Sequence, residues 1–275
     1  MTTMFQVCNK SSVLAEADEA YDDAKTNHGY RMMRDCFAGA RLTGQHYLWK
    51  DIFGYLIYPG IPVDRADLKI ADIATGNGIW LYDLAGKMPK TCEFHGFDVS
   101  LDQVTPKPWL QPNVQMHTWD IFEEPSSQFE SHFDIIHVRL ITLVVKNQDP
   151  RPVLANLTKM LIDMTNNSMK VASGVSGENL SKLFSQINVD DRWKGNFAQI
   201  MDENGYTGSS LYVYEAGLNV ARLLNDMYLG VWKEITTNML KAPEVSRALE
   251  QRSMEEVRNG AAIIYPQLVW VGKKV

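Results

Sequence analysis

Apolar and polar residues alternate between strand-like and helix-like spacing through the middle of the chain. Apolar runs predict strands over residues 69–74 and 133–139, and shorter strand-like segments lie between them at residues 92–99 and, after a proline-rich loop, at 114–118. Apolar residues at helical spacing predict a helix over residues 78–87, between the first two of these strands. Strands that alternate with helices are typical of an α/β domain with a parallel sheet, so we expect that architecture here.

The segment before the first strand is predicted to be helical. Helical spacing indicates one helix near residues 13–24 and a second helical zone over residues 30–57. The second zone contains three glycines that are expected to interrupt it: Gly39, Gly44 and Gly54. Prolines follow and end the helices, so residues 1–62 are predicted to form an N-terminal cap and residues 63–275 the α/β core.

The alternation weakens in the second half of the chain. A helix is predicted to start at Asp149 and Pro150, but only a weak strand over residues 169–172 follows it, where a parallel sheet needs a strong fifth strand. A helix that ends near residue 204, a strand over residues 211–215, two further helices over residues 217–238 and 243–258, and a closing strand over residues 263–271 are also predicted.

Composition narrows the classes of function. The 275 residues are 45% hydrophobic, which is enough for a packed core. Three cysteines without a CxxC pair predict neither a disulfide framework nor a zinc site, and we expect no metal. A net charge of −6 argues against nucleic acid as a partner. No apolar run has the length of a membrane span, and the N-terminus lacks the pattern of a signal peptide. These features predict a small-molecule ligand and a cytoplasmic or nuclear protein.

A glycine-rich turn ends the first predicted strand. Gly76 and Gly78 follow Asp72, and glycines at such a turn allow backbone N–H groups to approach a ligand. A dinucleotide fingerprint needs a third glycine at the position that Leu81 occupies. The acidic-x-x-x-Gly-x-Gly turn of S-adenosylmethionine (SAM) enzymes fits better, and an ordinary turn between strand and helix is the alternative.

Carboxylates end the next two predicted strands. Asp98 follows Gly76 by 22 residues, close to the ~20 expected for an acidic residue that binds ribose hydroxyls. Asp120, between Trp119 and Ile121, follows the third strand in the same way. The alternative is that Asp98 forms a turn and Asp120 caps one.

Candidate catalytic and substrate-binding residues come from the fourth strand and the cap. His137 and Arg139 end the fourth strand, where a histidine can act as a base or orient an acceptor; packing roles are the alternative. His46 in the cap is a second candidate base, and the cap can close over the site as a lid or expose a solvated helix face. The candidate substrate-binding residues also lie in the cap: Tyr30, Gln45 and Trp49.

Six segments together resemble the fungal class I SAM-dependent methyltransferases of the LaeA type, many of which act in secondary metabolism. They are residues 41–46, 54–59, 72–80, 96–100, 133–140 and 269–274. The resemblance implies a Rossmann-like, seven-stranded, mostly parallel sheet with helices on both faces and an N-terminal helical cap. It also implies SAM as cofactor, S-adenosylhomocysteine as product, and cofactor contacts from Asp72, Ala74, Thr75, Gly76, Asn77, Gly78, Asp98, Val99, Trp119, Asp120, Ile121 and His137.

Two departures from the family pattern shape the expected function. Ala74 stands where the family has the first glycine of its turn, and residues 161–168 stand where it has a Lys-Pro-Gly-Gly turn and an apolar fifth strand. We expect a methyltransferase that acts on an oxygen or nitrogen of a small secondary metabolite. Two alternatives remain: the same fold could catalyse cyclisation or rearrangement of a biosynthetic intermediate, or it could serve as a regulatory protein with a protein partner.

Overall fold

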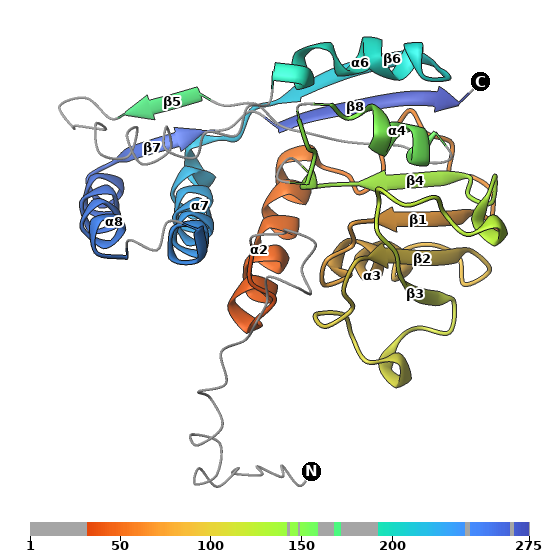
Figure 1. The fold of residues 1–275 in the computed structure, drawn as a ribbon, viewed down its shortest axis with the longest axis horizontal. Helices are drawn as coiled ribbons and strands as arrows, with labels where there is room; N and C mark the ends of the chain where they lie inside the picture. Colours follow the sequence, from red (N-terminus) through yellow and green to blue (C-terminus); the bar gives the residue numbers. More distant parts are fainter. Residues whose placement is uncertain are drawn as a thin grey trace, which may run out of the picture. The chain divides into compact units, whose positions relative to one another are not determined.

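The structure, a computed structural model, describes most of the chain from residue 32 onward (Figure 1). The described ranges are 32–141, 144–147, 149–158, 168–171, 192–239, 243–264 and 267–274. They belong to one compact unit, residues 31–275. The predicted helix near residues 13–24 lies outside the described residues, and the predicted boundary at residue 62 stays a prediction.

A four-stranded parallel sheet is confirmed where the apolar runs predicted it. It consists of β1 (Lys69–Ile73), β2 (Glu93–Asp98), β3 (Val114–Thr118) and β4 (Ile135–Val138), in the order β3-β2-β1-β4 (Figure 1). The register places Asp72 of β1 opposite His137 of β4 and opposite Gly96 of β2. Two candidate site residues that are far apart in the sequence therefore lie on neighbouring strands.

The two faces of this sheet bury different hydrophobic clusters. Ile70 and Ile135 pack against α3 (Ile79–Ala85) on one face. Ile73 and Val138 pack on the other face with α4 (Arg151–Leu157). Because successive side chains of a strand point to opposite faces, Asp72 and His137 lie on the α3 face of the sheet.

The remaining strands form two separate antiparallel pairs. β5 (Ser168–Val171) pairs with β7 (Ala261–Ile264), and β6 (Tyr206–Tyr214) pairs with β8 (Gln267–Lys274). The weak strand predicted over residues 169–172 therefore does not extend the parallel sheet, and the single closing strand predicted over residues 263–271 is two strands. A seven-stranded sheet is not present in the described part of the chain.

The outer edge of β4 faces β8 without a described strand that pairs with it. Figure 1 draws β8 on the side of β4 away from β1, and Leu268 and Trp270 of β8 share a hydrophobic cluster with Ile136 and Val138 of β4. The strong fifth strand that a parallel sheet needs, and that the sequence does not predict after residue 158, would pair with this edge of β4. Residues of both edges line a pocket there.

The helix before the sheet, α2 (Cys36–Phe53), lies within the predicted helical zone over residues 30–57 and is more regular than predicted. Asp35 caps its start by accepting a hydrogen bond from the backbone N–H of Ala38 at 2.8 Å. Gly39 and Gly44 do not interrupt it, which corrects the prediction, while Gly54 ends it with a φ of 78°. A Cβ at Gly44 would lie 3.4 Å from Met227 Sδ, so the glycine lets α7 (Leu218–Met239) pack closely against α2.

Helices complete the C-terminal half. α6 (Phe197–Glu203) packs on β6 and β8, and α7 packs on α8 (Pro243–Arg258) and on β7 (Figure 1). The two predicted helices over residues 217–238 and 243–258 are confirmed. Among the described residues, no helix has the length and apolar character needed to cross a membrane.

Candidate functional site

The glycine-rich turn after β1 has the backbone conformation that its residues predict. Gly76 and Gly78 have φ angles of 59° and 78°, which favour glycine. Ala74 also has a positive φ, 54°, at a cost of roughly 1–2 kcal/mol for a residue with a Cβ. This conformation gives a physical reason for glycine at the same position in the family that the sequence resembles.

Asp98, at the end of β2, is hydrogen-bonded to this turn. Its Oδ2 accepts a hydrogen bond from the backbone N–H of Gly76 at 2.9 Å, and its Oδ1 accepts one from the backbone N–H of Ser100 at 3.3 Å. Burial raises the pKa of Asp98, and the backbone N–H groups of Gly76, Ser100 and Val99 oppose that shift. A carboxylate offers about four lone pairs, so Asp98 keeps acceptor capacity for a ligand hydroxyl.

Asp72 joins the turn to the end of β4. Its Oδ2 accepts a hydrogen bond from Thr75 Oγ1 at 2.6 Å, and its Oδ1 lies 2.7 Å from His137 Nδ1. Asp72 is buried, and burial lowers the pKa of His137 although the carboxylate partly opposes the shift. A neutral His137 therefore donates from Nδ1 to Asp72, which leaves Nε2 as an unprotonated acceptor.

A pocket lies beside this pair, between β4 and β8. The His137 ring stacks on Trp80 with centroids 3.8 Å apart and an interplanar angle of 5°. Trp80 Nε1 donates to the carbonyl of Leu56 at 3.1 Å, which holds the segment after α2 over the pocket. Aromatic and basic side chains form much of its lining: Phe53, Tyr55, Tyr58, Trp80, His137 and Arg139.

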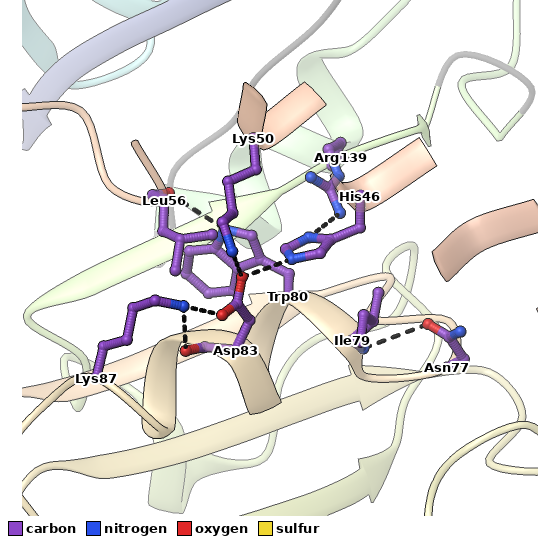
Figure 2. A network of polar contacts seen from close by, with 9 residues as sticks. All are labelled: His46, Lys50, Leu56, Asn77, Ile79, Trp80, Asp83, Lys87 and Arg139. Atoms are coloured by element: carbon purple, nitrogen blue, oxygen red, sulfur yellow. Dashed lines mark hydrogen bonds and ion pairs between the residues drawn. The ribbon is translucent and has the colours of Figure 1, made fainter. Parts of the chain in front are cut away.

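A polar network links α2 with α3 and the end of β4 (Figure 2). Asp83 of α3 accepts hydrogen bonds from Lys50 at 2.7 Å and from Lys87, and it lies 3.0 Å from His46 Nε2. The other ring nitrogen, His46 Nδ1, lies 3.3 Å from Arg139 Nη2. His46 is fully buried, and both of its nitrogens are engaged.

The surroundings of His46 keep its ring neutral. Burial, reinforced by Arg139 and Lys50, lowers the pKa of His46 to about 3, so the ring is neutral at pH 7. In that state Nε2 donates to Asp83 and Nδ1 accepts from Arg139. This geometry suits a residue that positions α2 over the site.

The candidate substrate-binding residues lie in the packing of α2. Gln45 is buried, and its Oε1 accepts a hydrogen bond from Arg41 at 3.3 Å. Trp49 is buried with the Arg139 guanidinium 5.1 Å from its ring centroid. Neither side chain is among those that line the pocket. Tyr30, the third candidate, lies outside the described residues.

Helix α2 also covers the glycine-rich turn. Asn77 Nδ2 donates to the carbonyl of Gly39 and to Thr43 Oγ1, each at 3.0 Å. A Cβ at Gly76 would lie 3.1 Å from Leu42 Cδ1, so the absence of a side chain at this glycine admits Leu42. The cap helix is therefore in direct contact with the turn.

The residues after β2 and β3 lie where the spacing predicted. Trp119 donates its backbone N–H to the carbonyl of Asp98 at 2.8 Å, and its ring is half-buried. Asp120 Oδ1 accepts from the backbone N–H of Phe122 at 2.9 Å, so it caps a turn, as the alternative interpretation held. Ile121 is buried and Val99 half-buried at the same edge.

Sequence reasoning missed Trp80 and Asp83 as members of the site. Asp83 follows Trp80 by three residues, which puts both on one side of α3, and it pairs with Lys87, which lies four residues further on, just beyond the end of the helix. That spacing is a signal of a helix ion pair. The partners from α2, His46 and Lys50, are set by tertiary packing and have no signal in local spacing.

Buried His46 makes a testable contribution to the pH dependence of stability. A folded pKa of about 3 against about 6.5 in the unfolded chain means that the unfolded chain binds more protons between these values. The stabilisation is complete above pH 6.5 and is lost as the pH falls towards 3. Between pH 7 and pH 5 we expect His46 to lower the free energy of unfolding by roughly 2 kcal/mol.

Urea unfolding at the two pH values measures this effect. In His46→Gln, which carries no proton at either pH, the pH-dependent loss should be smaller than in the parent protein by about that amount. Equal losses in both proteins would show that His46 does not stay neutral in the folded state.

Comparisons with known proteins find methyltransferases. No model of a known protein family matches the chain. The chain is 28% identical over 141 residues to the N-methyltransferase verN of Clonostachys rogersoniana, which covers 51% of this chain and 48% of verN. It is 31% identical over 110 residues to the N-methyltransferase tcpN of Claviceps purpurea. This alignment covers 40% of this chain and 39% of tcpN. The matched part thus spans less than half the length of these curated relatives.

Solved structures give a more distant similarity. Phosphoethanolamine N-methyltransferase 2 of Haemonchus contortus, in complex with phosphomonomethylethanolamine and S-adenosylhomocysteine, aligns with a TM-score of 0.45 at 13% identity. The alignment covers 84% of this chain and 58% of that one. At this level of similarity the structural alignment is a likeness only.

Proposed function

We propose that this protein is a SAM-dependent methyltransferase that acts on a nitrogen of a small molecule. The observation that carries the proposal is the hydrogen bond from Gly76 to Asp98, which brings the glycine-rich turn and the carboxylate of the next strand to one edge of the parallel sheet. Ligands of open α/β sheets bind at this edge. The similarity to fungal N-methyltransferases over about half of the chain supports the same reaction class.

The residues at this edge fit the cofactor. The turn from Ala74 through Gly78, with Thr75 and Asn77, would hold the methionine part beside Asp72. Asp98, with Val99 next to it, would accept a hydrogen bond from a ribose hydroxyl, and Trp119, Asp120 and Ile121 would surround the adenine. When bound, SAM supplies an electrophilic methyl group on a sulfonium ion.

His137 is the group that we propose to accept a proton from the substrate nitrogen. Asp72 holds the ring with Nδ1 protonated, and Trp80 fixes its plane, so Nε2 is the basic atom. Because burial lowers the pKa of His137, this atom stays unprotonated at neutral pH. His46 is proposed as a positioning residue, because both of its nitrogens are engaged.

The pocket between β4 and β8 is the proposed site for the methyl acceptor. Its aromatic side chains, Tyr55, Tyr58 and Trp80, suit a flat, largely apolar molecule, and Arg139 offers a cationic group at one end. Helix α2 covers the turn through Leu42 and Asn77, so we propose that it acts as a lid that moves to admit the ligands and then excludes water.

Transfer of labelled methyl groups tests the function. The purified protein is incubated with methyl-labelled SAM and a panel of small molecules that carry secondary amine, amide or phenol groups. We expect label in at least one nitrogen-bearing product, with the mass gain of one methyl group. A protein that binds SAM but labels no acceptor in the panel would contradict the choice of substrate class.

A second candidate function follows from the gap between β4 and β8. No described strand pairs with the outer edge of β4, and residues of β4 and β8 line the pocket there. A pocket of this shape could hold a reactive intermediate for cyclisation. A product of unchanged mass, formed without consumption of SAM, would favour this candidate over methyl transfer.

We also propose membership of the LaeA type, a cytoplasmic or nuclear location, and a small molecule as the binding partner. The six segments that resemble the LaeA type support membership of that group. The few cysteines, with Cys92 buried and free, support a reducing compartment such as the cytoplasm or nucleus. The substrate is proposed to be a small molecule, without a nucleic acid or a membrane as partner, and a protein partner would belong to the regulatory alternative.

A further inference from the structure

A second group of chemically active side chains lies at the other end of β2 from Asp98. Glu93 and His95 occupy the start of β2, and His132 lies in the loop that leads into β4. Asp98 is five residues further along the strand than Glu93, about 16 Å away at the usual rise per residue. This group is thus separate from the proposed cofactor site.

The three side chains place their possible ligand atoms close together. Glu93 offers a carboxylate oxygen, and His95 and His132 offer one ring nitrogen each; these three atoms lie within 4.8 Å of one another. Glu93 and His95 are two residues apart in a strand, so they share a face of the sheet. The side chain of Glu93 is 47% exposed, so it is able to move towards the two histidines.

One of the converging atoms lacks a hydrogen-bond partner. The side chain of His95 is only 5% exposed, and no atom of the described residues hydrogen-bonds to its Nε2. The nearest carboxylate oxygen, Glu93 Oε2, lies 3.7 Å away, beyond hydrogen-bonding distance. A buried polar nitrogen without a partner costs about 1–3 kcal/mol, so this atom points to a ligand between the two side chains.

The other nitrogen of His95 is held in the way that metal-binding histidines usually are. His95 Nδ1 lies 3.0 Å from Nε2 of His117 on β3. With a metal ion on His95 Nε2, the proton resides on Nδ1 and is donated to His117. Such an outer partner fixes the tautomer and the ring plane of a ligand.

We propose that Glu93, His95 and His132 bind a divalent transition-metal ion, with Zn²⁺ as the best match. Two imidazole nitrogens and one carboxylate oxygen suit Zn²⁺, whereas Ca²⁺ and Mg²⁺ prefer oxygen ligands. The ion ties the start of β2 to the loop before β4 and stabilises that loop. The cysteine count alone gave no sign of such a site, because its ligands are two histidines and a glutamate.

Zinc titration of tag-free, chelator-stripped protein tests the site. Calorimetry should show one Zn²⁺ per chain with a Kd of about 1 µM or tighter. At 100 µM Zn²⁺ the Tm should rise by about 5 °C. His132→Asn and Glu93→Gln should each weaken binding by at least about tenfold, because each removes one of three ligands.

The matched control is Glu130→Gln, which changes an exposed carboxylate in the same loop region outside the converging group. Its zinc affinity should equal that of the parent protein. Absence of binding by the parent protein at 100 µM Zn²⁺ would overturn the proposal. Zinc binding by His132→Asn and Glu93→Gln as tight as in the control would also overturn it, because the ion would then lie elsewhere. Neither result depends on methyl transfer.

Discussion

Replacing His137 with asparagine should lower kcat of methyl transfer by about 10²–10⁴-fold, the usual contribution of a positioned general base. The introduced side-chain amide can still donate to Asp72 in place of the imidazole Nδ1, so the buried carboxylate keeps a partner. The basic Nε2 is lost. Steady-state rates with the acceptor found in the labelling experiment, together with the Tm, measure the effect.

The pH profile separates a catalytic His137 from a structural one. Since burial lowers the pKa of His137, the parent enzyme should keep its kcat as the pH falls below 6.5 and lose it only at lower pH. In His137→Asn this acidic limb should disappear. A variant that retains full kcat would rule out His137 as the base.

Replacing Asp98 with alanine should weaken SAM binding by about 100-fold. A ribose hydroxyl that donates to a buried carboxylate contributes about 3 kcal/mol, which corresponds to roughly that factor in Kd. Alanine also removes the acceptor for the backbone N–H of Gly76, which loosens the turn. Equilibrium dialysis with labelled SAM measures the affinity.

Two further variants show whether the carboxylate or the turn is responsible. Asp98→Asn keeps an oxygen for Gly76 but loses the charge, so its affinity should fall between those of the parent and the alanine variant. Asp102→Ala removes an exposed carboxylate nearby, which accepts a hydrogen bond from Ser100 Oγ at 2.7 Å, and should bind SAM normally. Normal binding by Asp98→Ala would place the cofactor elsewhere.

The first half of the fold was predictable because its strands carry a strong local signal. β3 was predicted with its observed bounds, and β1 within one residue. The buried strand β1 reads as a short apolar run before turn residues, and the proline-rich loop before β3 marks where that strand starts. The turn after β1 and Asp98 were predictable from the spacing of 22 residues, and the hydrogen bond between Gly76 and Asp98 brings them together.

The rest depended on tertiary packing, which local patterns do not encode. Gly39 and Gly44 were expected to break a helix, but both lie within α2, which packs against α7. The weak strand β5 pairs antiparallel with β7, a partner far along the chain that its local pattern does not identify. The pairing of His137 with Asp72 follows from the register of β1 and β4, a property of two strands and of neither alone.

Titration of SAM into the purified, unmodified protein by isothermal calorimetry tests the central claim most directly. The account predicts one site per chain with a Kd in the micromolar range (about 1–100 µM) for SAM and for S-adenosylhomocysteine, and no binding of NAD, because Leu81 occupies the position of the third glycine that a dinucleotide needs. Absence of binding by SAM and S-adenosylhomocysteine would contradict the account, because the glycine-rich turn beside Asp98 would then hold no such cofactor.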